Sequence, residues 1–255
     1  MIKGTTLVEQ LLLLIASFIA NTFSAFSGGG AGLIQFPLLI FLGLPFSLAL
    51  ATHKVASVAL GVGACLRHAR ERNLWLRISL LMVVAGVPGV LIGALLIVHV
   101  PDWAATKALG VLTLGLGLYS VFKPKLGQEV RVVESTSRHL LIGAAGLFVI
   151  GVLNGSLTSG TGLFATMWLV RWFGLDYKRA VAHTLVWVGT LWNGSGALTL
   201  GLISDIHWPW LPALLAGSLL GGYAGAHLAI TKGSGWIKRA FEVITLITGV
   251  MLLLK

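Results

Sequence analysis

The sequence predicts an all-α membrane protein with many spanning helices, and its composition provides the first evidence. Of the 255 residues, 56% are hydrophobic and only 10% are charged, and the mean hydropathy is +0.93. A soluble domain carries roughly a quarter charged residues, because its surface faces water. Apolar runs long enough to cross a hydrocarbon core of ~30 Å recur along the chain. They lie at 78–98, 104–122, 139–157, 209–230 and 236–254.

The other compositional features agree with this fold class. The 33 glycines are typical of helices that pack closely in a membrane. The formal net charge of +10 fits basic residues gathered in cytoplasmic loops, so we expect the bilayer and no nucleic acid as a partner. Lys3 is followed by an apolar stretch to about Ala25, which is interpreted as a retained first helix rather than a cleaved signal.

The chain matches itself at a shift of about 130 residues, so it contains an internal repeat. Glycines carry much of the match. The matched pairs include Gly32 with Gly162, Gly43 with Gly174, Gly89 with Gly221 and Gly93 with Gly225. We predict two transmembrane repeats, at 1–122 and 139–255, joined by a polar cytoplasmic linker at 123–138.

The distribution of positive charge predicts that the two repeats are inverted relative to each other. The helix at 48–66 is followed by four arginines, so its loop is expected to be cytoplasmic. The matching loop, 201–208, has no Lys or Arg, and the next pair of loops shows the reverse pattern. Corresponding loops therefore face opposite sides, as in many secondary transporters built from inverted repeats.

Each repeat begins with a hairpin whose second arm is short. The arms at 31–43 and 161–173 cover only about 20 Å, so whether they cross the membrane or re-enter stays open. Three full spans follow in each half, which gives eight to ten membrane segments. Glycine-rich breaks, Ser27–Gly32 and Asn154–Gly162, precede the short arms. Such breaks are tolerated beside a polar cavity, and a helix that starts there presents N–H groups suited to an anion; the alternative is close helix packing.

A second polar cluster, Thr52–Lys54, lies near the start of an apolar helix, and the repeat aligns it with His183–Leu185. A cation inside a membrane segment is costly and indicates function by default. Two other interpretations stay open: the Lys54 ammonium reaches the interface from a helix end, and the histidines only pack and hydrogen-bond. The Asn193 amide serves either a ligand or an interhelical hydrogen bond.

The acidic residues favour an anion as the ligand. Seven of the eight fall in loops or near predicted helix ends. Glu242 alone lies within a helix, where Lys238 is expected to form an i,i+4 pair with it. A pathway for cations normally presents carboxylates inside the membrane.

Two motifs, present in order in both halves, carry a resemblance to a known family. They are the glycine run followed by Pro37, and Ala49-x-Ala51-Thr52-His53-Lys54 with its second-half form Ala180-x-Ala182-His183-Thr184, Asn193 and Gly201. The sequence resembles the sulfite exporter TauE/SafE family of membrane proteins over nearly its whole length. The resemblance implies a permease of the bacterial cytoplasmic (inner) membrane that exports, or in some cases imports, sulfite, organosulfonates or related sulfur anions.

The chain departs from the family pattern at two places. The second glycine run is Ser159-Gly160-Thr161-Gly162, with Met167 near the position of the proline. Leu185 stands where many relatives have a second lysine. We therefore expect an asymmetric site with one cation.

Our hypothesis is alternating access around a site between the two hairpin tips. Backbone N–H groups cradle an oxyanion, Lys54 supplies the charge, and the other side chains hydrogen-bond to the anion. The predicted substrate-binding residues are Gly29, Gly30, Thr52, His53, Lys54, Ser159, Gly160, Gly162, His183, Thr184 and Asn193. A histidine at this site would couple transport to protons.

Other classes of protein stay open at this stage. They are a passive anion channel, a membrane subunit that acts with a partner, and a membrane enzyme or haem protein with His53 and His183 as axial ligands. The sequence has no HExxH, Walker A or GxSxG motif, and Cys65 is its only cysteine. We therefore expect no enzymatic activity, no cofactor and no metal. A homodimer also stays open, because glycine-rich faces pack within or between chains.

Overall fold

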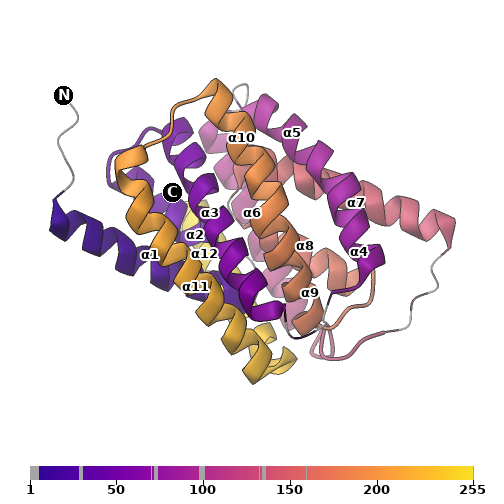
Figure 1. The fold of residues 1–255 in the computed structure, drawn as a ribbon. Coiled ribbons are helices and arrows are strands. Elements are labelled where there is room, and N and C mark those ends of the chain that lie inside the picture. The colour runs from indigo at the N-terminus through magenta and orange to yellow at the C-terminus, as the bar shows by residue number, and fades with distance from the viewer. Residues whose placement is uncertain are drawn as a thin grey trace.

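The computed structural model describes residues 6–28, 31–69, 71, 74–97, 101–131, 133, 136–158 and 160–254. The regular elements in these ranges are all helices, and they pack side by side in one bundle (Figure 1). Among the described residues, five helices are long and apolar enough to cross a membrane, judged by length and composition. They are Leu7–Ser27, Leu48–His68, Leu76–Leu96, Ser137–Leu157 and Trp208–Lys232. The predicted all-α membrane fold is confirmed.

Both halves follow the same order of elements: a hairpin with a short second arm, then three long helices. The first half has α1 (Leu7–Ser27), α2 (Ala31–Phe41), α3 (Phe46–His68), α4 (Leu76–Leu81), η1 (Met82–Gly86), α5 (Val87–Leu96) and α6 (Asp102–Val121). The second half has α7 (Ser137–Leu157), α8 (Thr161–Arg171), α9 (Tyr177–His183), η3 (Thr184–Trp192), α10 (Asn193–Ile203), η4 (Trp208–Trp210), α11 (Leu211–Lys232) and α12 (Ser234–Leu254). The segments η1 and η3 are π-helical turns inside otherwise continuous helices.

The hairpins break where the glycine-rich sequences predicted a break. α1 ends before Gly28, whose φ is 100°, and α8 begins after Gly160, whose φ is 73°. Backbone of this left-handed kind favours glycine, because a side chain would strain it. The short arms α2 and α8 have 11 residues each, so each covers about 16 Å.

Matched glycines hold matched helices together across the two halves. α11 packs along α1, and α5 packs along α7. A Cβ atom at Gly225 would overlap the Thr22 carbonyl of α1, and one at Gly93 would overlap the Val152 carbonyl of α7. Gly93 and Gly225 are a matched pair of the repeat, 132 residues apart, and Thr22 and Val152 are 130 residues apart. The two interfaces are therefore equivalent, as duplication requires.

Counterpart helices run antiparallel where they touch. Gly61 of α3 lies against Gly189 of η3, while Lys54, earlier in α3, lies against Gly196, later in α10. α6 and α12 are antiparallel in the same way. Their contacts pair Gly110 with Leu253 and Gly117 with Thr245. These directions agree with an inverted repeat; the orientation of each half in a bilayer, and the domain boundaries, stay predictions.

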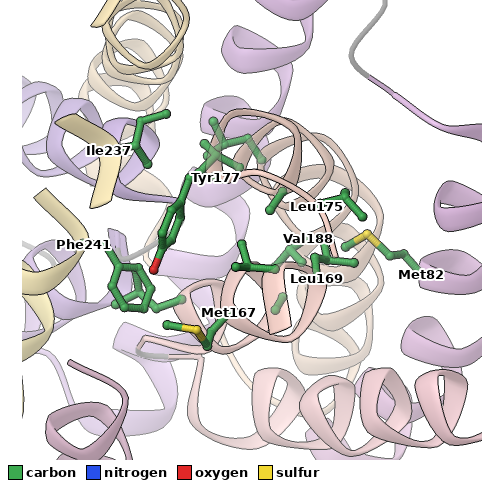
Figure 2. Close-up of a cluster of buried hydrophobic side chains, with 14 of the residues drawn as sticks. Met82, Met167, Leu169, Leu175, Tyr177, Val188, Ile237 and Phe241 are labelled. Carbon is green, nitrogen blue, oxygen red and sulfur yellow. The ribbon is translucent and has the colours of Figure 1, made fainter. Parts of the chain in front are cut away.

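A large hydrophobic core joins the second half to the first. Figure 2 shows Tyr177 of α9 beside Phe241 of α12, with their ring centroids 5.6 Å apart. The Tyr177 hydroxyl lies 3.1 Å from the Ser120 hydroxyl of α6. The buried Lys238 forms an ion pair with Glu242, which confirms the i,i+4 pair expected from the sequence.

Candidate functional site

A small cavity lies where the two hairpin tips meet α3 and η3. Its volume is about 30 Å³, enough for about one or two water molecules. Most of the side chains around it are small or polar. The lining residues are Ser24, Gly32, His53, Ser57, Leu60, Asn154, Thr158, Thr161, Gly162, Thr184, Leu185, Val188, Gly189 and Asn193.

The two repeats line this cavity with equivalent positions. Several of its residues form pairs separated by the shift of about 130 residues that relates the halves. These pairs are Ser24 with Asn154, Gly32 with Gly162, His53 with Thr184, and Ser57 with Val188. Residues at matched positions of both halves therefore line the cavity, but their chemistry differs from one half to the other.

The first turns of both short helices face the cavity. Gly32 is the second residue of α2, and Thr161 and Gly162 begin α8. Side chains hold the second tip in place, since Asn154 Nδ2 donates to Thr161 Oγ1 over 2.8 Å and Thr161 Oγ1 donates to the Thr158 carbonyl over 2.9 Å. Helix N-termini carry backbone N–H donors and partial positive charge, so the tips suit an anion.

Lys54 is completely buried immediately behind the cavity wall. Its Nζ donates to the Asn154 carbonyl (2.8 Å), to Asn154 Oδ1 (2.9 Å) and to Asn193 Oδ1 (3.3 Å). Gly196 makes room for the side chain, because a Cβ there would lie 2.8 Å from Lys54 Cδ. No carboxylate of the described residues lies within 4.0 Å of the ammonium. The charge therefore has polar neighbours but no opposite charge in this part of the chain.

His53 lines the cavity, and both of its ring nitrogens contact buried polar side chains. Its Nδ1 lies 2.7 Å from Gln35 Oε1, and its Nε2 lies 3.1 Å from the Ser57 hydroxyl. The second half repeats this arrangement, because the hydroxyls of Thr166 and Thr184 are 2.9 Å apart. Both pairs are separated by 18 residues. An imidazole thus occupies the place that a threonine occupies in the other half.

Two of the predicted site residues, Thr52 and His183, do not line the cavity. Thr52 Oγ1 accepts a hydrogen bond from the backbone N–H of His207 over 2.9 Å. His183 Nε2 accepts one from the backbone N–H of Trp75, also over 2.9 Å. The structure thus places both side chains in contacts between the halves.

The other predicted residues are distributed as follows. His53, Gly162, Thr184 and Asn193 line the cavity. Gly160 is the N-cap residue of α8. Gly29, Gly30 and Ser159 lie outside the described residues.

Sequence reasoning did not select Asn154, Thr158 and Thr161, although all three line the cavity. Asn154 lies in the second glycine-rich break, which was interpreted through its backbone alone. An available signal was the amide side chain itself, since a buried amide inside an apolar helix needs a hydrogen-bond partner. Asn154 supplies two of the three contacts of the Lys54 ammonium.

A bundle of apolar helices with broken helix ends beside a small polar cavity is the architecture of a multi-pass membrane protein, and broken helices around a central site are typical of transporters. The chain matches the family described as Sulfite exporter TauE/SafE over residues 13–252. It belongs to this family, which confirms the resemblance seen in the sequence.

Bacterial relatives match nearly the whole chain. A probable membrane transporter protein of Haemophilus influenzae is 34% identical over 227 residues, covering 89% of this chain and 88% of the relative. The probable membrane transporter protein YfcA of Escherichia coli K12 is 27% identical, covering 97% of this chain and 91% of the relative. The probable membrane transporter protein YdhB of Bacillus subtilis is 26% identical, covering 95% and 100%. No solved structure matches this chain.

Proposed function

We propose that the protein is a secondary transporter of small sulfur oxyanions, such as sulfite or organosulfonates, in the bacterial cytoplasmic membrane. The observation that carries the proposal is the Lys54 ammonium, which is buried and bonded only to uncharged oxygens among the described residues. The family description supports the sulfur anion, and the names of the relatives support transport.

The charge balance favours an anionic ligand. An ion buried in protein is costly unless an opposite charge or several hydrogen bonds stabilise it. Asn154 and Asn193 supply the hydrogen bonds, and both asparagines also line the cavity. An anion in the cavity would face their amides and the two helix tips, and it would supply the missing negative charge.

The small volume of the cavity supports alternating access. A space for about one or two waters leaves little room for an oxyanion, so binding requires the cavity to widen. In transporters with inverted repeats, one bundle of helices moves against the other around a central site.

Proton coupling through His53 is part of the proposal. The imidazole lies on the cavity and is bonded to Gln35 and Ser57, so a proton taken up there would change the charge beside the anion. A passive anion channel is the alternative function. It differs from a carrier in that its flux does not saturate and shows no counterflow.

The test is flux across liposomes that contain the purified protein. The anions would be sulfite, sulfoacetate, taurine, thiosulfate, sulfate and a carboxylate. Lys54→Ala is compared with Lys232→Ala, which removes an exposed lysine at the end of α11. We expect saturable flux of a sulfur oxyanion that is lost in Lys54→Ala and kept in Lys232→Ala. Equal flux in the two variants would remove Lys54 from the site, and flux without saturation would favour the channel.

A further inference from the structure

Two hydrogen bonds tie the halves together at equivalent positions. The backbone N–H of Trp75, in the first half, donates to His183 Nε2 in the second half. The backbone N–H of His207, in the second half, donates to Thr52 Oγ1 in the first half. The repeat aligns Thr52 with His183, and its shift also relates Trp75 to His207. The two bonds are therefore the same contact formed twice.

The two acceptor side chains also make the same second hydrogen bond, to a carbonyl of their own helix. Thr52 Oγ1 donates to the Leu48 carbonyl four residues earlier, over 2.6 Å. His183 Nδ1 lies 2.9 Å from the Arg179 carbonyl, again four residues earlier. This bond to its own helix makes His183 Nδ1 the donor and leaves Nε2 as the acceptor for Trp75. Each side chain thus accepts a hydrogen bond from the other half and donates one to a carbonyl of its own helix.

The two bonds lie at opposite ends of one antiparallel helix pair. Thr52 is near the start of α3, and its partner follows the end of α10. His183 ends α9, and its partner Trp75 follows the connection after α3. The 16 residues from Thr52 to the end of α3 at His68 correspond to about 24 Å of helix. The bonds are therefore on opposite sides of the cavity.

Between the two bonds the helices touch at a pair of glycines. A Cβ at Gly61 would overlap the Gly189 carbonyl carbon, so the two backbones are in direct contact there. Leu60 and Gly189 also line the cavity, so this contact lies at its level. No side chains interlock at this close contact, so it would serve as a pivot if the two helices tilted against each other. Tilting about it would break the bond at one end and keep the bond at the other.

We propose that the Thr52–His207 and His183–Trp75 hydrogen bonds are the two gates of the transporter, one toward each side of the membrane. The inference rests on the proposed function. Both hydrogen bonds are formed in this structure. Thr52 and His183 are thus gate residues because they hold helices of the two halves together, and neither needs to touch the anion.

The gate at His183 has additional contacts. The Arg179 guanidinium lies 5.5 Å from the centre of the Trp75 ring, and Trp187 Nε1 donates to the Ser79 hydroxyl over 2.8 Å. This gate lies on the side of the arginine-rich connection, which the charge pattern assigns to the cytoplasm.

The test measures access to the cavity from each side. Val188 lines the cavity and is replaced by cysteine in a Cys65→Ser background, so that the new thiol is the only one in the chain. A membrane-impermeant thiol reagent is applied to right-side-out and to inside-out vesicles. Thr52→Val and His183→Leu remove the acceptor atoms with little change in volume. Thr52→Ser and His183→Gln keep an acceptor and serve as controls.

Each acceptor variant should open one side only. We expect Thr52→Val to increase labelling about fivefold from the side of the 201–208 loop, and His183→Leu to do so from the side of the 69–75 connection. The controls should label as slowly as the parent. Faster labelling from the same side in both variants would overturn the proposal. So would unchanged labelling in both, provided that gel filtration shows folded protein.

The result is separable from that for the proposed function. Lys54→Ala should lose flux and keep the sided labelling pattern, because Lys54 contacts neither gate. If no anion is transported but the sided labelling pattern is found, the gate assignment is supported and the proposed substrate is wrong. If flux depends on Lys54 but no variant shows sided labelling, the gate assignment is wrong.

Discussion

The indole Nε1 of Trp192 donates a hydrogen bond to the Met82 carbonyl, 2.8 Å away. Met82 begins the π-helical segment η1 of the first half, and Trp192 ends the π-helical segment η3 of the second half. The indole also covers Gly86, where a Cβ would overlap the ring. Segments of π-helix interrupt the regular backbone ladder and often occur near functional sites. Here one side chain joins two such segments from different halves.

We predict that this contact contributes measurably to stability. Trp192→Phe removes the donor and keeps a ring, so it should cost about 0.5–1.5 kcal/mol. Gly86→Ala should cost more, about 1–3 kcal/mol, because the new Cβ meets the buried ring. Unfolding of the purified protein in detergent measures both changes. Gly115→Ala is the matched control, since a Cβ at Gly115 has no neighbour within 4 Å. Equal stability of the Gly86 and Gly115 variants would contradict the packing argument.

Equivalent glycines of the two halves should respond equally to substitution. Gly93→Val and Gly225→Val each force side-chain atoms against a carbonyl of the partner helix. We expect each substitution to lower the free energy of unfolding by about 1–3 kcal/mol or more, and the two values to be similar. Thermal unfolding monitored by gel filtration is a suitable measurement. A large loss at one position with none at the other would show that the matched interfaces differ in the folded protein.

A carboxylate at position 154 should inactivate the site. Asn154→Asp places a negative charge where Oδ1 now lies 2.9 Å from Lys54 Nζ. It would pair with the ammonium and repel an incoming anion, and like charges ~4 Å apart at an effective dielectric constant of ~20 repel by about 4 kcal/mol. We expect anion flux in liposomes to fall by more than about tenfold. Asn154→Ser introduces the residue found at the matched position 24 and removes the same amide contacts without adding a charge, so it should retain more flux than Asn154→Asp. Flux in the Asp variant equal to that in the Ser variant would count against an anion site here.

His53→Gln tests proton coupling without removing the polar contact. Glutamine keeps hydrogen bonding toward Gln35 and Ser57 but does not titrate. We expect flux to continue and its dependence on a pH gradient to disappear. The measurement is anion uptake into liposomes with and without an imposed proton gradient. His183→Gln should leave the response to the gradient in place, because His183 is bonded to backbone groups away from the cavity. Unchanged dependence in His53→Gln would exclude this histidine as the coupling group.

Several features followed from the sequence by itself, because each depends on local composition. Apolar runs of about 20 residues determine membrane helices, since lipid requires every backbone polar group to be satisfied within the segment. The glycine runs at 28–30 and 160–162 determined where the hairpins break, and the internal match revealed the duplication. The polar residue types inside the apolar helices identified Lys54 and His53 as candidates.

Only the tertiary structure decided how the polar residues are divided between the cavity and the contacts of the two halves. Thr52 and Lys54 are two residues apart on α3, so their side chains leave the helix in different directions: the Lys54 ammonium reaches Asn154, and the Thr52 hydroxyl reaches His207. Asn154 is 100 residues from Lys54, and His183 is 108 residues from Trp75. No local pattern specifies such pairs, because they arise when helices of different halves pack against each other.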